Sequence, residues 1–469
     1  MSELINNQNT KVLKALLELG PGKATAEYLA LVCVMGVASV YRSLEELIER
    51  NILHKTGTTY SLNSTNPFVQ KFSELLDAEK MMNLDPRAYQ EVVEVANEMR
   101  NHFRENDYSL AVFGSSTRGT ATMDSDVDLL LVVERELGEA FPIESTHMLS
   151  QLTVMTRAQF ADAWKKSNEV ARSSVSWGIL LHDPWRMFYD YRTTMPKTPV
   201  TTEALMSARK DIERMLERFR ECRELKNWEL GQSLGARTAT AIGRALLMET
   251  SVTPRTGPEI PRQLQRTGYS IWQDVQRLAS PRNAGKKAYD ETSDSVERLY
   301  AYLWNLTSER TLFSDLLSII WGQQNEAMNN LCAIFKELGA KCSGCQGADC
   351  RLVNKNGKEV TLEYKSTSKG IDGRVGNYLM KRLRQDAKIL IYNPYREYPP
   401  DIRSYKIHPA VIEAAKSRGI SLVPSRDLFG LIADWIAERK SGVELELVEK
   451  LEEIADRITE SKQFDSAYG

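Results

Sequence analysis

Apolar residues at the start of the chain recur at helical spacing in three short runs. The third run is the clearest, because Val40, Leu44 and Leu47 return every three or four residues and so share one helix face. Two four-residue segments then flank a short turn around Gly57, which predicts a small hairpin. The predicted helices are Lys11–Leu19, Thr25–Cys33 and Val37–Arg50, and the hairpin joins residues 52–55 to 59–62 through Thr56-Gly57-Thr58.

Three helices followed by a hairpin resemble a winged helix, which we assign to residues 1–66. The third helix of such a fold lies in a DNA major groove, and its exposed residues would be Ser39, Arg42 and Ser43. The same helix carries three glutamates, which oppose contact with phosphates. Winged helices also serve as docking modules for proteins, so DNA contact and protein docking both remain open.

An apolar strand at Ser109–Phe113 leads into a turn that suits a phosphate group. Gly114 lets the backbone bend sharply where a phosphate must approach. Ser115 and the amides of a following helix N-terminus can hold the β- and γ-phosphates of a nucleotide. Arg118 could add positive charge beside the triphosphate, or pair with a surface acid.

Asp126 and Asp128 stand two apart on the next strand, so both carboxylates face the same way. Such a pair can hold two Mg²⁺ ions, one activating the attacking hydroxyl and one bracing the triphosphate. The segment resembles the minimal nucleotidyltransferases of the polymerase-β-like superfamily, whose signature is Gly-Ser, Arg-Gly and Ser-Asp-x-Asp-Leu. The resemblance implies a nucleoside triphosphate with Mg²⁺ or Mn²⁺. The matching residues are Gly114-Ser115, Arg118-Gly119 and Ser125–Leu129.

The nucleotidyltransferase-like domain is assigned to residues 67–195. With its predicted closing strand, Gly178–Asp183, and the winged helix before it, this region resembles the regulator-type nucleotidyltransferase proteins of prokaryotes. Active members take a third carboxylate from the strand after the acid pair, here Gln151–Thr156. The expected position holds Thr153, and Glu144 falls upstream of the strand. Nucleotide binding is therefore expected, whereas nucleotidyl transfer lacks its general base.

Residues 196–321 show helical periodicity, most clearly at Ala204–Glu224 and Ser233–Glu249. Minimal nucleotidyltransferases often pair with a HEPN-type helical domain, whose active ribonucleases use an arginine and a histidine a few residues apart. The sequence has no histidine between His182 and His408. We therefore interpret this region as a helical linker domain that serves as a packing scaffold.

A second group of candidate residues follows an amphipathic helix that starts near Gly322. Asp349 lies on one predicted strand, and Glu363 and Lys365 stand two apart on the next, hence on one face. Two carboxylates and a lysine can bind Mg²⁺, orient a water and stabilise a pentavalent phosphate. The alternative is a surface hairpin with ordinary charges.

This pattern resembles the PD-(D/E)XK signature of the restriction-endonuclease-like superfamily, especially its Mrr-like nucleases. Those nucleases begin with a helix bearing an acid, matched here by Glu326. The resemblance implies a nuclease-like domain over residues 322–438, active or degenerate, before an acidic helical tail at 439–469. The later elements fit the fold's order: a helix at Val375–Gln385, a strand at Ala387–Tyr392, a helix at Pro409–Arg418 and a strand at Ile420–Pro424.

The register of the predicted hairpin decides whether its acids can meet. If Asn356-Gly357 forms a two-residue turn, Asp349 lies opposite Tyr364 and points away from Glu363. If a three-residue turn begins at Lys355, Asp349 lies opposite Glu363, with Cβ atoms about 5 Å apart. We predict the second register, because a shared metal ion requires it.

Six cysteines in a chain of 469 residues do not make a disulfide scaffold. Three of them cluster at Cys342, Cys345 and Cys350, but a zinc site needs a fourth ligand. The sequence nearby offers no obvious candidate, so we expect reduced structural or surface cysteines.

The net charge of −2 gives no global signal for nucleic acid, but the charges are unevenly distributed. Residues 341–409 hold 14 lysines and arginines against 7 acids, and residues 443–469 hold 8 acids against 3 bases. A basic domain beside an acidic tail suits nucleic-acid binding, although solvated surface charge gives the same pattern. No apolar run reaches the roughly 20 residues of a membrane span, and the N-terminus lacks a signal-peptide core. A cytoplasmic protein without a membrane partner is expected.

The sequence thus predicts a multidomain α/β protein with a winged helix, a nucleotidyltransferase α/β fold, a helical linker domain and a restriction-endonuclease-like α/β domain. The leading hypothesis is an Mg²⁺-dependent DNA endonuclease coupled to a nucleotide-binding nucleotidyltransferase domain, a combination that resembles prokaryotic genome-defence effectors. One alternative is a nucleotidyltransferase that modifies an RNA end or a protein hydroxyl, with an inactive C-terminal domain. Another is a DNA-binding transcriptional regulator. DNA and a nucleotide are the expected partners, and a homo-oligomer or a defence-complex subunit is left open.

Overall fold

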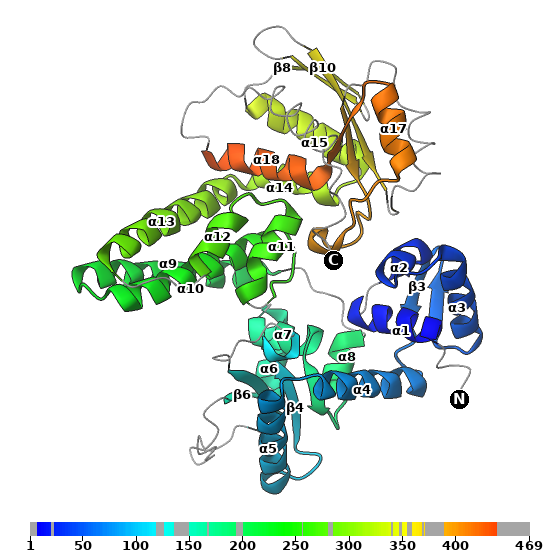
Figure 1. Ribbon diagram of the computed structural model, residues 1–469, viewed down its shortest axis with the longest axis vertical. Helices are drawn as coiled ribbons and strands as arrows, with labels where there is room; N and C mark the ends of the chain where they lie inside the picture. Colours follow the sequence, from blue (N-terminus) through cyan, green and yellow to red (C-terminus); the bar gives the residue numbers. More distant parts are fainter. Residues whose placement is uncertain are drawn as a thin grey trace. The chain divides into compact units, whose positions relative to one another are not determined.

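The computed structural model is a multidomain α/β structure (Figure 1). The chain divides into two compact units, Met1–Met206 and Ser207–Gly469, and each unit has its own β-sheets. The structure describes residues 7–19, 23–118, 126–135, 150–166, 168–193, 200–255, 257–279, 285–338, 341–346, 349–353, 359–367, 370 and 389–438.

The first unit begins with three helices and a three-stranded antiparallel sheet in the order β1-β3-β2. Val40, Leu44 and Leu47 are fully buried, as their helical spacing predicts. The elements are α1 (Asn7–Leu19), β1 (Ala24–Thr25), α2 (Ala26–Val32), α3 (Val37–Glu49), β2 (Leu53–Thr56) and β3 (Thr59–Leu62).

Two details of this region differ from the sequence prediction. Thr56 pairs with Thr59, so the hairpin turns through two residues, and Gly57 takes the left-handed φ of +60° that suits such a turn. Ser43 is buried rather than exposed, whereas Arg42 is exposed. Helical geometry explains this burial, because residue 43 lies three positions after Val40 and so turns toward the same packed face.

A four-stranded sheet with the order β6-β5-β4-β7 forms the second part of this unit. β4 runs antiparallel to β5 and β7, whereas β5 runs parallel to β6. Helix α5 packs on one face, and α6, α7 and α8 pack on the other. The two central strands are therefore buried on both faces, which explains their unbroken apolar sequence. The elements are α4 (Pro67–Met82), α5 (Pro86–His102), β4 (Tyr108–Phe113), β5 (Val127–Val133), β6 (Ser150–Thr156), α6 (Arg157–Lys165), α7 (Glu169–Ser176), β7 (Ile179–His182) and α8 (Met187–Thr193).

Helices occupy most of the chain between residues 202 and 321, in agreement with the predicted periodicity. Glu249 is buried there, and Arg209 and Arg310 each approach one of its carboxylate oxygens at 2.7 Å. Two cations thus compensate one buried acid. The helices are α9 (Thr202–Glu224), α10 (Trp228–Glu249), α11 (Ile260–Thr267), α12 (Trp272–Ala279), α13 (Lys286–Ser308) and α14 (Arg310–Trp321).

A five-stranded sheet with the order β12-β11-β10-β9-β8 follows helix α15 (Gln324–Glu337). β8, β9 and β10 are antiparallel neighbours, whereas β11 and β12 extend the sheet in parallel. The predicted helix at 375–385 and the tail at 439–469 lie outside the described residues. The remaining elements are β8 (Lys341–Gln346), β9 (Asp349–Val353), β10 (Glu359–Ser366), β11 (Ile389–Asn393), α17 (Pro409–Ser417), β12 (Ser421–Pro424) and α18 (Ser425–Glu438).

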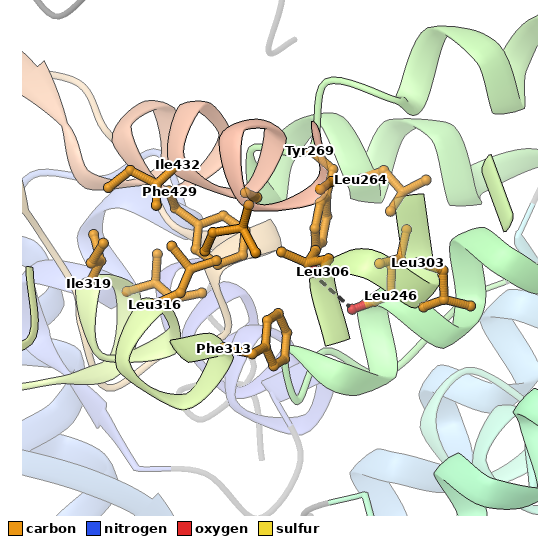
Figure 2. Close-up of a cluster of buried hydrophobic side chains, with 14 of the residues drawn as sticks. Leu246, Leu264, Tyr269, Leu303, Leu306, Phe313, Leu316, Ile319, Phe429 and Ile432 are labelled. Atoms are coloured by element: carbon orange, nitrogen blue, oxygen red, sulfur yellow. Dashed lines mark hydrogen bonds between the residues drawn. The ribbon is translucent and has the colours of Figure 1, made fainter. Parts of the chain in front are cut away.

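The helices and the five-stranded sheet share one hydrophobic core. Phe429 of α18 packs in a cluster with Phe313 and Leu316 of α14 (Figure 2). Tyr269 is fully buried in the same cluster, and its hydroxyl donates a hydrogen bond to the carbonyl oxygen of Leu246 at 3.3 Å (Figure 2). The core thus runs across residue 321, where the sequence analysis separates a helical from a nuclease-like domain.

A buried ion pair in the first unit provides a test of stability. Arg192 on α8 donates to both carboxylate oxygens of Asp77 on α4, at 2.9 and 3.2 Å, and also to the carbonyl oxygens of Val175 and Gly178. The Asp77→Ala variant leaves the guanidinium buried without its counter-charge. We expect the free energy of unfolding, measured by urea denaturation, to fall by about 3–5 kcal/mol.

The matched control is Glu74→Ala on the same helix. Glu74 pairs with a lysine at the surface, where both side chains are at least half exposed. Such pairs contribute little, so the expected loss is less than about 1 kcal/mol. Equal losses in the two variants would show that Asp77 does not stabilise the fold through its charge.

Candidate active sites

Gly114 directly follows strand β4 and takes a conformation that only glycine adopts readily, with φ at +83°. A Cβ at this position would overlap Oδ2 of Asp128. The carboxylate therefore packs directly against the Gly114 backbone. The β4–β5 register produces this contact, because Phe113 pairs with Asp128. The Gly-Ser turn and the second acid of the motif, predicted to act together, are thus neighbours.

The turn after Gly114 is closed by hydrogen bonds within itself. The Thr117 hydroxyl donates to the Gly114 carbonyl oxygen at 3.1 Å, and the Arg118 amide donates to the Ser115 carbonyl oxygen at 3.2 Å. The Arg118 guanidinium lies 4.7 Å from the centroid of the Trp177 ring, a cation–π distance. Ser115 is partly exposed. Motif residues 119–125 lie outside the described residues.

Asp126 and Asp128 differ in their surroundings. Asp126 is exposed just before β5, whereas Asp128 is partly buried at its second residue. Burial, followed by the negative charges of Asp126 and Glu169, raises the pKa of Asp128 to about 6. Carboxylates are the hard oxygen ligands that Mg²⁺ prefers. This pair therefore fits a divalent cation, and the cation would relieve the repulsion.

Glu169 is a nearby acid that sequence reasoning missed. It is the first residue of α7, whose N-terminus is capped by the Asn168 side chain through hydrogen bonds from the Val170 and Ala171 amides. Ala171 of α7 packs on the sheet face that also carries Phe113, and Asp128 shares that face because it pairs with Phe113. The Glu169 side chain is exposed, and its charge acts on Asp128. A long segment separates the two acids in sequence, so no local motif predicts their approach.

Strand β6 places a different residue beside the acid pair than the one predicted. Gln151 lies directly opposite Asp128 in the parallel β5–β6 pair, whereas Thr153 lies opposite Leu130. Gln151 therefore lies level with Asp128, and Thr153, where the third carboxylate is expected, lies two residues further along the strand. Neither residue is an acid, and Glu144 lies outside the described residues.

The second candidate site lies on β9 and β10. Asp349 pairs with Glu363, and Val353 pairs with Glu359. This is the register of the predicted three-residue turn, which brings the Asp349 backbone opposite Glu363. Turn residues 354–358 and the Asp349 side chain lie outside the described part of the structure.

Glu363 and Lys365 come together on the face of β10 predicted for them. Glu363 is 2% exposed, and the Lys365 Nζ lies 2.5 Å from its Oε1. Glu363 pairs with Leu390, which belongs to the core under α17. The ion pair is therefore held between a strand and an apolar layer, where it is shielded from water.

Glu326 occupies the first turn of α15 and is exposed. The start of this helix lies beside the end of β10, because the Ser366 hydroxyl donates to the Gly322 carbonyl oxygen at 3.3 Å. However, α15 packs in the core that contains Leu362, whose side chain points to the opposite face of β10 from Glu363. Glu326 thus belongs to a helix that packs on the other face of β10 from Glu363.

None of the described helices combines the length and apolar character that a membrane crossing requires.

Comparison with known proteins agrees with the geometry of the first site. Residues 92–177 match a family model of the nucleotidyltransferase domain. A comparison with curated proteins gave no match. The matched segment runs from α5 to the end of α7 and contains the glycine turn, both acids of β5 and Glu169. The chain therefore carries a nucleotidyltransferase domain at residues 92–177.

Proposed function

We propose that residues 92–177 bind a nucleoside triphosphate with Mg²⁺ and transfer its nucleotidyl group to a hydroxyl. The observation that carries this proposal is the packing of the Asp128 carboxylate against the Gly114 backbone. The absence of a side chain at Gly114 leaves room for this carboxylate beside the turn, and Asp126 and Asp128 supply ligands for the cation that accompanies the phosphates of a nucleotide.

Each residue of this site has a distinct role in the proposed reaction. The acceptor oxygen forms a bond to the α-phosphorus, pyrophosphate leaves, and the acceptor proton passes to a base. Asp126 and Asp128 would hold Mg²⁺, which supplies charge stabilisation for the phosphates. Glu169 is the base that we propose, since β6 offers only Gln151 and Thr153 near the acid pair. The proposed acceptor is an RNA end or a protein hydroxyl.

Metal-nucleotide binding should depend on Asp128 and on pH. The carboxylate is ionised only above its pKa of about 6, so affinity for Mg²⁺-nucleotide should rise as the pH passes from 5 to 7. Calorimetric titrations measure this profile. Asp128→Asn should weaken binding by about tenfold or more and flatten the pH profile. An unchanged affinity in Asp128→Asn would remove this residue from the site.

Glu169→Gln tests the proposed base. Losing a general base should lower the turnover number by about 100-fold or more, while nucleotide affinity changes little. Transfer of radiolabel from α-labelled nucleotide to acceptors reports the rate. Glu203→Gln, at the start of α9 and outside the matched segment, is the control. Full activity in Glu169→Gln would mean that another group takes the proton.

We propose a second activity, Mg²⁺-dependent cleavage of DNA, at β9 and β10. It is supported by the pairing of Asp349 with Glu363 and by the close contact of Lys365 with Glu363. The two acids would hold Mg²⁺, which polarises the water that attacks phosphorus. Lys365 would stabilise the negative charge that develops on the phosphate. Three antiparallel strands extended by two parallel strands also agree with the restriction-endonuclease-like order.

Lys365→Ala tests this second activity. Stabilisation of developing charge matters in the transition state, so cleavage should fall by about 100-fold or more while DNA affinity is largely kept. Nicking of supercoiled plasmid and gel retardation measure the two quantities. Lys416→Ala, which removes a partly exposed lysine of α17, should cleave normally. Wild-type cleavage by Lys365→Ala would refute the site and leave nucleotidyl transfer as the chain's activity.

We further propose that residues 1–66 form a winged helix that recruits DNA or a protein. The order α1-β1-α2-α3-β2-β3 supports this assignment. Val37, Tyr41 and Arg42 are exposed on α3, and so are Glu45 and Glu49, so its solvent face mixes apolar surface, one cation and two acids. A regulator of transcription remains the non-enzymatic alternative. A role in prokaryotic genome defence rests only on the proposed combination of domains.

A further inference from the structure

Three cysteines from three different elements lie together at the β8 edge of the five-stranded sheet. They are Cys332 on α15, Cys342 on β8 and Cys350 on β9. Their sulfur atoms all lie within 4.8 Å of one another, and the sulfurs of Cys342 and Cys350 are 2.8 Å apart. Cys332 and Cys350 are buried, and Cys342 is partly buried. The cluster is therefore enclosed rather than spread over the surface.

Strand pairing and helix packing explain why these residues converge. Cys350 pairs with Leu362 across β9 and β10, and Cys342 pairs with Leu352 across β8 and β9. Both leucines belong to the core that α15 covers, so the two cysteines share the face toward that helix. Cys332 lies on α15 within the same core. The helix thereby places a third sulfur over the two on the sheet.

The sequence supplies a fourth cysteine at a spacing typical of metal sites. Cys345 follows Cys342 by three positions on β8, a Cys-x-x-Cys pair. Its side chain lies outside the described part of the structure. The β8–β9 register shifts between Ser343 and Gln346, so the strand departs from regular pairing at this cysteine. Cys-x-x-Cys ligands need such a local bend to direct both sulfurs at one ion.

We propose that Cys332, Cys342, Cys345 and Cys350 bind one Zn²⁺ ion as a closed structural site. Four thiolates are the usual donors of structural zinc, with Zn–S distances of about 2.3 Å and hence sulfur–sulfur separations of about 3.8 Å. The three described sulfurs lie within 4.8 Å of one another, and the Cys342 and Cys350 sulfurs, 2.8 Å apart, would separate by about 1 Å to bind the ion. The bound ion would tie α15 to β8 and β9. This proposal does not rest on either proposed activity.

The sequence beside Cys342, Cys345 and Cys350 does not reveal a fourth ligand, because Cys332 lies ten positions before Cys342 on a separate helix. Cys332 lies on a predicted amphipathic helix, and the helical pattern alone predicts only that it is buried. The structure folds that helix onto the sheet and brings Cys332 to Cys342 and Cys350.

Disulfide formation is the competing chemistry of the same sulfurs. Cys332 is disulfide-bonded in the structure, contrary to the reduced state expected from the sequence, and a disulfide must be reduced to thiolates before its sulfurs can bind zinc. A disulfide joins sulfurs only in pairs and does not require three of them to converge. This convergence of three elements favours the metal as the occupant under reducing conditions.

Metal analysis of the full chain tests the proposal. The protein is produced with zinc in the medium, purified with a reductant and without chelators, and measured by mass spectrometry for metal content. We expect one zinc per chain in the wild type and in Cys222→Ser, which removes a buried cysteine of α9 outside the cluster. Cys332→Ser and Cys350→Ser should each lose at least half of the zinc.

Because these variants could unfold, the wild type is also loaded with Co²⁺. Four thiolates should give the intense visible bands of tetrahedral cobalt with sulfur-to-metal charge transfer, and addition of Zn²⁺ should abolish them. Cys332→His, which keeps a ligand, should bind cobalt with a shifted spectrum. Absence of metal from the reduced, folded wild type would overturn the proposal. Two intact disulfides under reductant, or equal zinc in the wild type and Cys332→Ser, would overturn it as well.

Discussion

The contact between the Gly114 backbone and the Asp128 carboxylate is the constraint on which the nucleotidyltransferase domain depends. It requires a left-handed residue directly after β4 and an acid as the second residue of β5, and the pairing of Phe113 with Asp128 brings the two together. The strands behind them are buried on both faces, so this carboxylate sits at the edge of an apolar core. That position raises its pKa. The low dielectric that penalises its charge also strengthens its attraction to a cation.

In both units the pairing of two strands decides where the acids lie. The two pairs differ in how far apart their strands are along the sequence. The β9–β10 hairpin joins strands that are close in sequence, so the turn between them sets which residues face each other. In β5 and β6 the strands are parallel and separated by a long connection, so packing of the whole sheet sets the register. A slip of one residue would move every side chain to the opposite face. The buried apolar positions on each strand oppose such a slip.

Buried charges in both units are compensated by specific partners. Arg192 pairs with Asp77, Glu249 with two arginines, and Lys365 with Glu363. The acids around the glycine turn differ, because Asp126 and Glu169 are exposed while Asp128 is only partly buried. The charges of Asp126 and Glu169 add to burial in raising the pKa of Asp128. Excess negative charge at one end of a sheet is what a bound divalent cation would neutralise.

The sequence by itself determined the local elements and the motifs they carry. Helical spacing predicted α3, the order of glycine and acids predicted the turn beside β5, and the two-residue spacing of Glu363 and Lys365 placed them on one face. Tertiary structure decided which distant residues join these motifs: Gln151 opposite Asp128, Glu169 beside it, and Cys332 over the sheet cysteines. The physical reason is that periodicity records the direction of a side chain relative to its own helix or strand. Which element packs against that face depends on the fit of entire apolar surfaces, and that fit is a property of the folded chain.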